Sequence, residues 1–219
     1  MSFRELHTAA VHVVHIERAA DIDTHLLQSR FGIHPIDADS TLSPAVESTF
    51  SSYRSYGYLA VLWPSMDTTR ELRFFIDRRS LIIIGDTATH LFRQQLEHLQ
   101  TDEQSARWQM NGPEILIDLL HELITTEQPF PSRANAIRLD SLTVALRQCG
   151  TWLQTDYRTV VPRMILLAHT LDLMSEQVRT TAAMTATKDA TIIVPQVVRG
   201  YAVAAAIMIV GVIVTLSLH

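Results

Sequence analysis

The C-terminal end constrains this chain most, because residues 200–218 form an apolar run without a charged residue or a proline. As a helix rising about 1.5 Å per residue, this run would be roughly 28 Å long, close to the hydrocarbon thickness of a bilayer. A helix also satisfies its own backbone hydrogen bonds, as lipid requires. The run predicts one membrane-spanning segment, which we place at residues 192–218. The alternative is a buried C-terminal core helix.

The flanks of the apolar run predict its orientation. Arg199 precedes the run, Tyr201 lies at interface depth, and no basic residue follows. Basic residues concentrate on the cytoplasmic side of a membrane segment. We therefore expect a single-pass protein of the inner cell membrane with its large N-terminal part in the cytoplasm.

The composition agrees with a water-soluble body that carries one anchor. The chain has 219 residues, of which 47% are hydrophobic and 19% are charged, so it is too polar for a multi-spanning protein. Its net charge of −5 provides no basic surface, so nucleic acid is not an expected partner. Cys149 is the only cysteine, which excludes a disulfide framework and a thiolate metal site.

The first 128 residues predict an α/β domain. Residues 9–16 are rich in β-formers, with Val11, Val13 and His15 on one face, and predict a first strand. A helix over 24–30 follows, with Asp21 or Asp23 as its N-cap and Gly32 as its C-cap. Residues 33–44 suggest a short helical turn.

Four further strands are predicted at residues 46–53, 56–64, 71–77 and 80–85. The runs 58–63 and 81–84 are almost wholly apolar, which is typical of strands buried on both faces. Leu72, Phe74 and Ile76 instead alternate with charged neighbours, which predicts a half-exposed strand.

Beyond Asp86 the pattern is helical. His90 and His98 lie about two turns apart, too distant to share a metal ion. Pro113 predicts the start of one helix, and Ser132 begins a helical stalk over residues 132–191. From the stalk onward a seam has the heptad spacing of a coiled coil, apolar at first and then mostly polar, at Leu167, Leu171, Met174, Val178, Thr181, Thr185, Lys188 and Ile192. Such a seam packs either on its own domain or against copies of itself around an axis.

The order of these segments resembles a known family. The series consists of residues 31–37, a short helix, residues 47–56 leading into Leu59–Leu62, and residues 72–84. In this order the segments resemble the cytoplasmic domain of CorA-type magnesium transporters. The resemblance continues through helices to the tail. It implies a cytoplasmic α/β domain, long stalk helices that run into the membrane, and a homo-oligomer, specifically a pentamer.

The resemblance also implies an ion path lined by the membrane-proximal end of the stalk, with residues 191–195 at the entrance to the bilayer. Mg²⁺ gives up its water reluctantly, so such a path needs rings of oxygen ligands repeated by symmetry. By their position, Thr187, Asp189 and Thr191 are the candidate metal-contacting residues. For Asp189 the alternative is an interfacial carboxylate beside Lys188.

The sequence departs from the family pattern in two respects. The family carries a Gly-Met-Asn tripeptide followed by a second membrane helix, whereas this sequence has no Gly-Met-Asn and one apolar run. Gly200 and Tyr201 also resemble the start of the family's second membrane helix. Two assignments of the single span therefore remain open, to the first or to the second membrane helix of the family.

Enzymatic motifs are not evident. His121 and Glu122 form half of a zinc-protease motif, but Thr125 occupies the position of the second histidine. The seven glycines form no phosphate-binding loop. We therefore expect no catalytic residues and no organic cofactor.

Two hypotheses follow for function. The first is divalent metal cation transport, with Mg²⁺ as the cation, or its regulation, by a homo-oligomeric channel. The second is a non-conducting, membrane-anchored interaction protein on a CorA-like scaffold, whose partner is a full-length transporter or another membrane protein.

Overall fold

The computed structural model describes residues 3–7, 10–17, 22–65, 69–77, 79–85 and 110–185. The strands are β1 (Phe3–His7), β2 (His12–Ile16), β3 (Thr49–Ser52), β4 (Gly57–Pro64), β5 (Thr69–Ile76) and β6 (Ser80–Ile84). The labelled helices are α1 (Thr24–Phe31), α2 (Pro35–Ser40), α4 (Gly112–Thr126) and α5 (Arg133–Leu153). A last described helix, here called the 161–185 helix, follows α5.

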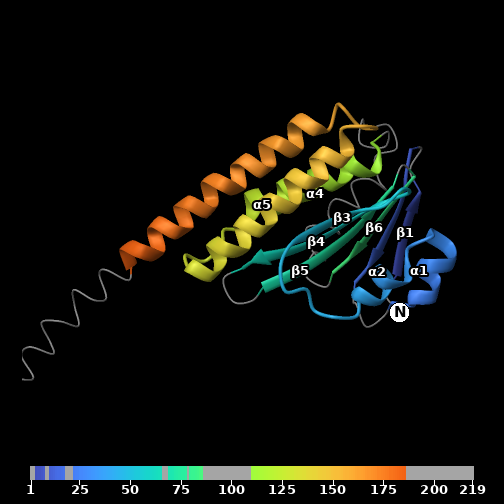
Figure 1. Cartoon of the computed structure of the whole chain (residues 1–219), viewed down its shortest axis with the longest axis horizontal. Coiled ribbons are helices and arrows are strands. Elements are labelled where there is room, and N and C mark those ends of the chain that lie inside the picture. The colour runs from blue at the N-terminus through green and yellow to red at the C-terminus, as the bar shows by residue number, and fades with distance from the viewer. Residues whose placement is uncertain are drawn as a thin grey trace, which may run out of the picture.

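One six-stranded sheet forms the middle layer of the domain. Its strand order is β1-β2-β6-β5-β4-β3; β2 and β6 pair in parallel, and all other neighbours are antiparallel. Helices α4, α5 and the orange 161–185 helix cover one face, while α1 and α2 cover the other (Figure 1). The described part of the chain is therefore a three-layer α/β domain.

The local signals for the first helices are confirmed. Asp23 caps α1, since its carboxylate accepts hydrogen bonds from the backbone N–H groups of His25 and Leu26. Gly32 ends α1 with a φ of 66°, a left-handed conformation that glycine adopts without a steric penalty. The short helix expected in residues 33–44 is α2.

The strand predictions differ from the structure at two places. β1 was not predicted, although it pairs with β2 as an antiparallel hairpin at the edge of the sheet. β3 begins at Thr49 rather than at residue 46, and Val46 is 94% exposed. The other predicted strands coincide with β2, β4, β5 and β6 to within a few residues.

The prediction that β5 is half exposed is wrong. Arg73 is 3% exposed and Phe75 is 2% exposed, so the second face of β5 is also covered. The Arg73 guanidinium donates to the backbone carbonyls of Ser40 and Ser43, at the end of α2, and to the Glu71 carboxylate. A charge can be buried here because these acceptors replace its hydration.

Each face of the sheet has its own apolar core. Leu59, Trp63, Phe74 and Ile83 belong to the core beneath α4, α5 and the 161–185 helix. The opposite core, beneath α1 and α2, contains Val14, Leu27, Ala60, Phe75, Ile82 and Ile84, among others. β4 and β6 are buried along almost their whole length, as their apolar runs predicted.

Helix α5 belongs to the layer that covers the sheet. It packs on β3 and β4, and its residues Leu139, Leu142 and Leu146 share the core with α4. At Gly57 in β4, an added Cβ would lie 2.9 Å from the Trp152 side chain, so glycine permits the close approach of α5. The predicted stalk begins at residue 132. In the structure its first helix, α5, shares one apolar core with the α/β domain.

Candidate functional site

The residues predicted to contact a metal ion, Thr187, Asp189 and Thr191, lie outside the described residues, as do His90 and His98. The predicted membrane segment at residues 192–218 lies outside them as well. Within the described part of the chain, no helix combines the length and the apolar character needed to cross a bilayer.

The first half of the predicted heptad seam packs on its own domain. Leu167, Leu171 and Val178 are buried in the core beneath the helices, and Met174 packs against that core. Thr181 and Thr185 are exposed. Residues 186–191 of the predicted stalk lie beyond the described part of the 161–185 helix.

Polar contacts accompany this packing. Arg147 pairs with Asp172, Arg163 pairs with Asp118 of α4, and Arg179 lies 2.8 Å from the Asp140 carboxylate. These ion pairs are partly exposed and each contributes little, typically under about 1 kcal/mol. Buried leucines contribute about 1.5–3 kcal/mol each, so apolar burial holds the helix on the domain.

A second face of the 161–185 helix remains exposed. Leu166, Leu173 and Met184 are 62%, 61% and 62% exposed. These residues belong to a set of six positions that are spaced alternately by four and three residues and therefore form one stripe along the helix: 166, 170, 173, 177, 180 and 184. We call it the outer stripe. A heptad stripe with exposed leucines suits packing against another helix.

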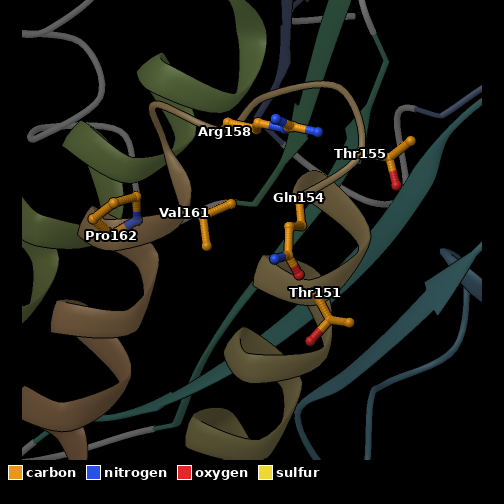
Figure 2. Close-up of a pocket in the computed structure, with 6 residues that line it drawn as sticks. All are labelled: Thr151, Gln154, Thr155, Arg158, Val161 and Pro162. Carbon is orange, nitrogen blue, oxygen red and sulfur yellow. The ribbon is translucent and has the colours of Figure 1, made fainter.

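A hollow of about 630 Å³ lies where α5 turns into the 161–185 helix (Figure 2). Thr151 and Gln154 come from the end of α5, Arg158 from the connecting loop, and Val161 and Pro162 from the start of the next helix. Arg158 and Gln154 are exposed. The hollow can offer hydrogen bonds and one positive charge in a solvated setting, which is too little to define a ligand.

A larger groove of about 990 Å³ lies where the described part of the 161–185 helix ends, beside the start of α5. Its lining is mostly apolar and includes Phe130, Ile137 and Ala182, with Arg133 and Arg179 as its charged residues. Phe130 and Ile137 are more than half exposed. An apolar groove at this position is a surface that a helix or a lipid-facing segment could cover.

A cluster of metal-binding residue types lies at the edge of the sheet. The ligand atoms of Glu5, His7 and His12 all lie within 4.8 Å of one another. The Nε2 atom of His12 is 3.0 Å from Oε2 of Glu5, and the Nε2 atom of His7 is 3.6 Å from the same oxygen. The two imidazole rings are stacked with their centroids 4.0 Å apart.

Arg30 of α1 binds the carboxylate of this cluster. Its guanidinium donates two hydrogen bonds to Glu5, at 2.6 and 2.8 Å, and these bonds hold the pKa of Glu5 below its usual value. Burial lowers the pKa of His12, against the opposing effect of Glu5. This cluster was not predicted, because β1 was not predicted and only the pairing of β1 with β2 brings the three residues together.

Other titratable groups serve the fold, namely Asp37, Tyr53, Tyr56 and Cys149. The buried carboxylate of Asp37 accepts hydrogen bonds from the hydroxyls of Tyr53, at 2.9 Å, and Tyr56, at 2.6 Å. Burial and then this carboxylate raise the pKa of both tyrosines, which remain protonated donors at neutral pH. Burial raises the pKa of Cys149 to about 12, so its thiol is not an activated nucleophile.

No protein-family model matches the sequence, and the search of curated proteins found no significant match. Among solved structures, the complete CorA magnesium transporter from Methanocaldococcus jannaschii matches with a TM-score of 0.59 at 12% identity, over 86% of this chain and 71% of that chain. The full-length CmaX protein matches with a TM-score of 0.51 at 14% identity, over 87% of this chain and 73% of that chain.

The cytoplasmic domain of ZntB from Vibrio parahaemolyticus matches with a TM-score of 0.50 at 10% identity, over 82% of this chain and 89% of that chain. Identities this low establish a shared fold and no more. The α/β fold expected from the sequence is confirmed by these neighbours. The described part of the chain has the fold of the CorA, ZntB and CmaX proteins.

Proposed function

We propose that this chain is a CorA-like membrane protein that acts in divalent metal cation transport, with Mg²⁺ as the first candidate, or in the regulation of that transport. The observation that carries the proposal is the structural match to a complete magnesium transporter over 86% of this chain. The apolar run at residues 200–218 supports it independently, because an uncharged run of this length is typical of a membrane-spanning helix.

The proposed protein works as a homo-oligomer, a pentamer by resemblance, with its α/β domain on the cytoplasmic side of the inner membrane. The outer stripe supports self-association because Leu166, Leu173 and Met184 leave apolar area exposed on a helix whose opposite face is already buried. Burying such leucines between copies would stabilise the assembly through the hydrophobic effect. In the sequence, the same helix precedes the predicted membrane segment.

In this proposal Thr187, Asp189 and Thr191 line the ion path. Repeated around a symmetry axis, their hydroxyl and carboxylate oxygens would form rings that suit a hydrated divalent cation. Substituting Asp189 with Asn removes the charge of one ring while keeping its oxygen. We expect Asp189→Asn to reduce cation flux more than Thr187→Ser does.

The second candidate function is a non-conducting interaction protein on the same scaffold. It is favoured by the absence of Gly-Met-Asn from the sequence and by the presence of one apolar run. Its partner would be a full-length transporter or another membrane protein. The two candidates share the membrane anchor and the α/β domain, so only a flux measurement separates them.

The deciding experiment expresses the full chain in a host that lacks magnesium uptake and measures growth at low magnesium. Rescue by wild type and loss of rescue in Asp189→Asn support transport. Absence of rescue, when the protein remains in the membrane after alkaline carbonate extraction, supports the interaction protein. Release by carbonate contradicts both candidates.

A second experiment tests assembly through the outer stripe. Light scattering of the detergent-purified chain is expected to give an oligomer, and the double variant Leu166→Glu and Leu173→Glu is expected to dissociate it. Val46→Glu is the matched control, because Val46 is 94% exposed and lies in the segment before β3. An oligomer that survives the double variant would show that other surfaces hold the copies together.

A further inference from the structure

We propose that Glu5, His7 and His12 form a binding site for a divalent transition-metal ion of the zinc class at the β1–β2 edge of the sheet. The site goes beyond the proposed function, because it requires neither a membrane segment nor a second copy of the chain. It also differs in chemistry from the proposed ion path.

The β1–β2 hairpin places the three side chains on one face. Glu5 and His7 are two residues apart in β1, so they point to the same side of the sheet. His7 and His12 are directly paired across the two strands, and paired residues share a face. Backbone pairing therefore fixes the positions of all three residues without a contribution from a loop.

The distances fit a tetrahedral ion. With metal–ligand distances of about 2.0–2.2 Å, two ligands of a tetrahedral zinc ion lie roughly 3.3–3.5 Å apart. The two distances to Oε2 of Glu5, 3.0 Å from His12 and 3.6 Å from His7, bracket this value. The His7 side chain is 68% exposed, so its ring is free to tilt until both Nε2 atoms point at one ion.

The ligand types select the class of metal. Two imidazoles and one carboxylate are ligands that zinc uses, with a fourth position left for water. Mg²⁺ prefers octahedral oxygen ligands, so two imidazoles disfavour it. Arg30 donates to both carboxylate oxygens of Glu5, to Oε1 at 2.6 Å and to Oε2 at 2.8 Å. A bound ion would take the place of the Arg30 bond at Oε2, while the bond to Oε1 would still orient the carboxylate.

The alternative is an ion-pair cluster that binds no metal. The Arg30–Glu5 pair and the His12–Glu5 hydrogen bond would hold the hairpin against α1 equally well in that case. His7 separates the two explanations, because its Nε2 atom lies 3.6 Å from the carboxylate, beyond ordinary hydrogen-bond length. In a structural cluster His7 contributes the stacking of its ring on His12, whereas a three-ligand site depends on its Nε2 atom.

The test titrates ZnCl₂ into the metal-stripped, detergent-purified full chain by calorimetry. We expect one tight site per chain, a loss of at least about tenfold in affinity in His7→Ala and in His12→Ala, and no competition from millimolar MgCl₂. Co²⁺ should give the intense visible absorption of tetrahedral coordination, and His7→Ala should remove it. His121→Ala and His169→Ala serve as controls, because both histidines are exposed and lie on other helices.

Circular dichroism of each variant verifies that it is folded. If His12→Ala fails to fold, the exposed His7→Ala variant decides the question alone. Zinc affinity that is unchanged in His7→Ala, or lost equally in His121→Ala, would overturn the proposal, as would a wild-type chain that binds no zinc. Because calorimetry reports metal binding alone, these outcomes are independent of magnesium rescue and of oligomer size.

Discussion

Arg73 is the residue whose environment differs most from its sequence pattern. It lies in the middle of β5, between apolar neighbours, and its side chain is 4% exposed. Its guanidinium donates hydrogen bonds to the backbone carbonyls of Ser40 and Ser43, at the end of α2, and to the Glu71 carboxylate in its own strand. A planar guanidinium can donate in several directions at once, which an ammonium cannot reproduce. Arg73 thereby fastens the α1–α2 layer to the sheet.

We expect Arg73→Met to lower the free energy of unfolding by about 3 kcal/mol, because it removes the hydrogen bonds that the buried guanidinium donates to the carbonyls of Ser40 and Ser43 and to the Glu71 carboxylate. Arg73→Lys should recover only part of this loss. Urea denaturation followed by tryptophan fluorescence measures both variants. Arg133→Met, at an exposed position of α5, is the control and should change stability by less than about 0.5 kcal/mol. Equal stability of Arg73→Met and wild type would refute this role.

Helix α4 shows how a whole element is specified by its first turn. Asn111 accepts a hydrogen bond from the backbone N–H of Glu114 at 3.0 Å, and the Glu114 side chain accepts one from the backbone N–H of Asn111 at 2.9 Å. Pro113 lies in the first turn, where its missing N–H is not needed. The buried stripe from Ile115 to Ile124 then packs on the sheet.

Asn111→Ala should cost about 1 kcal/mol of stability, because it leaves an N–H group at the start of α4 without an acceptor. Asn111→Asp should retain most of the stability, since a carboxylate accepts the same hydrogen bond. Thermal unfolding measured by circular dichroism compares the two variants. Destabilisation of the same size in both would show that the cap is not the cause.

At the scale of the whole molecule, the 161–185 helix joins two surfaces. Its inner face, with Leu167, Leu171 and Val178, completes the core above the sheet. On its outer stripe, Leu166, Leu173 and Met184 stay exposed. The helix itself is the orange one in Figure 1. The helix therefore joins the buried core of the domain to an exposed apolar surface.

Leu171→Ala should destabilise the whole described domain by about 3 kcal/mol, because Leu171 is fully buried and its truncation leaves a cavity. Circular dichroism and tryptophan fluorescence should report the same shifted transition. Leu173→Ala is the matched control, because Leu173 is 61% exposed two residues away. If Leu171→Ala has no greater effect than Leu173→Ala, the helix is not part of the cooperative unit.

The sequence by itself determined the elements whose signals are local. Several such signals are confirmed: the cap of α1, for which the structure selects Asp23 over Asp21, the end of α1 at Gly32, the start of a helix at Ser132, and the continuous apolar runs of β4 and β6. Such signals can be read from sequence because they arise within one turn of helix or along one strand.

Only the tertiary structure decided which residues share a surface. It paired β1 with β2, which gathered Glu5, His7 and His12, and it buried Arg73 under the end of α2. In the 161–185 helix, it buried the first residues of the predicted heptad seam in the core of the domain and left the outer stripe exposed. These outcomes depend on partners far apart in the chain, and the free energy of burial is set by all elements that meet at a position rather than by its neighbours in sequence.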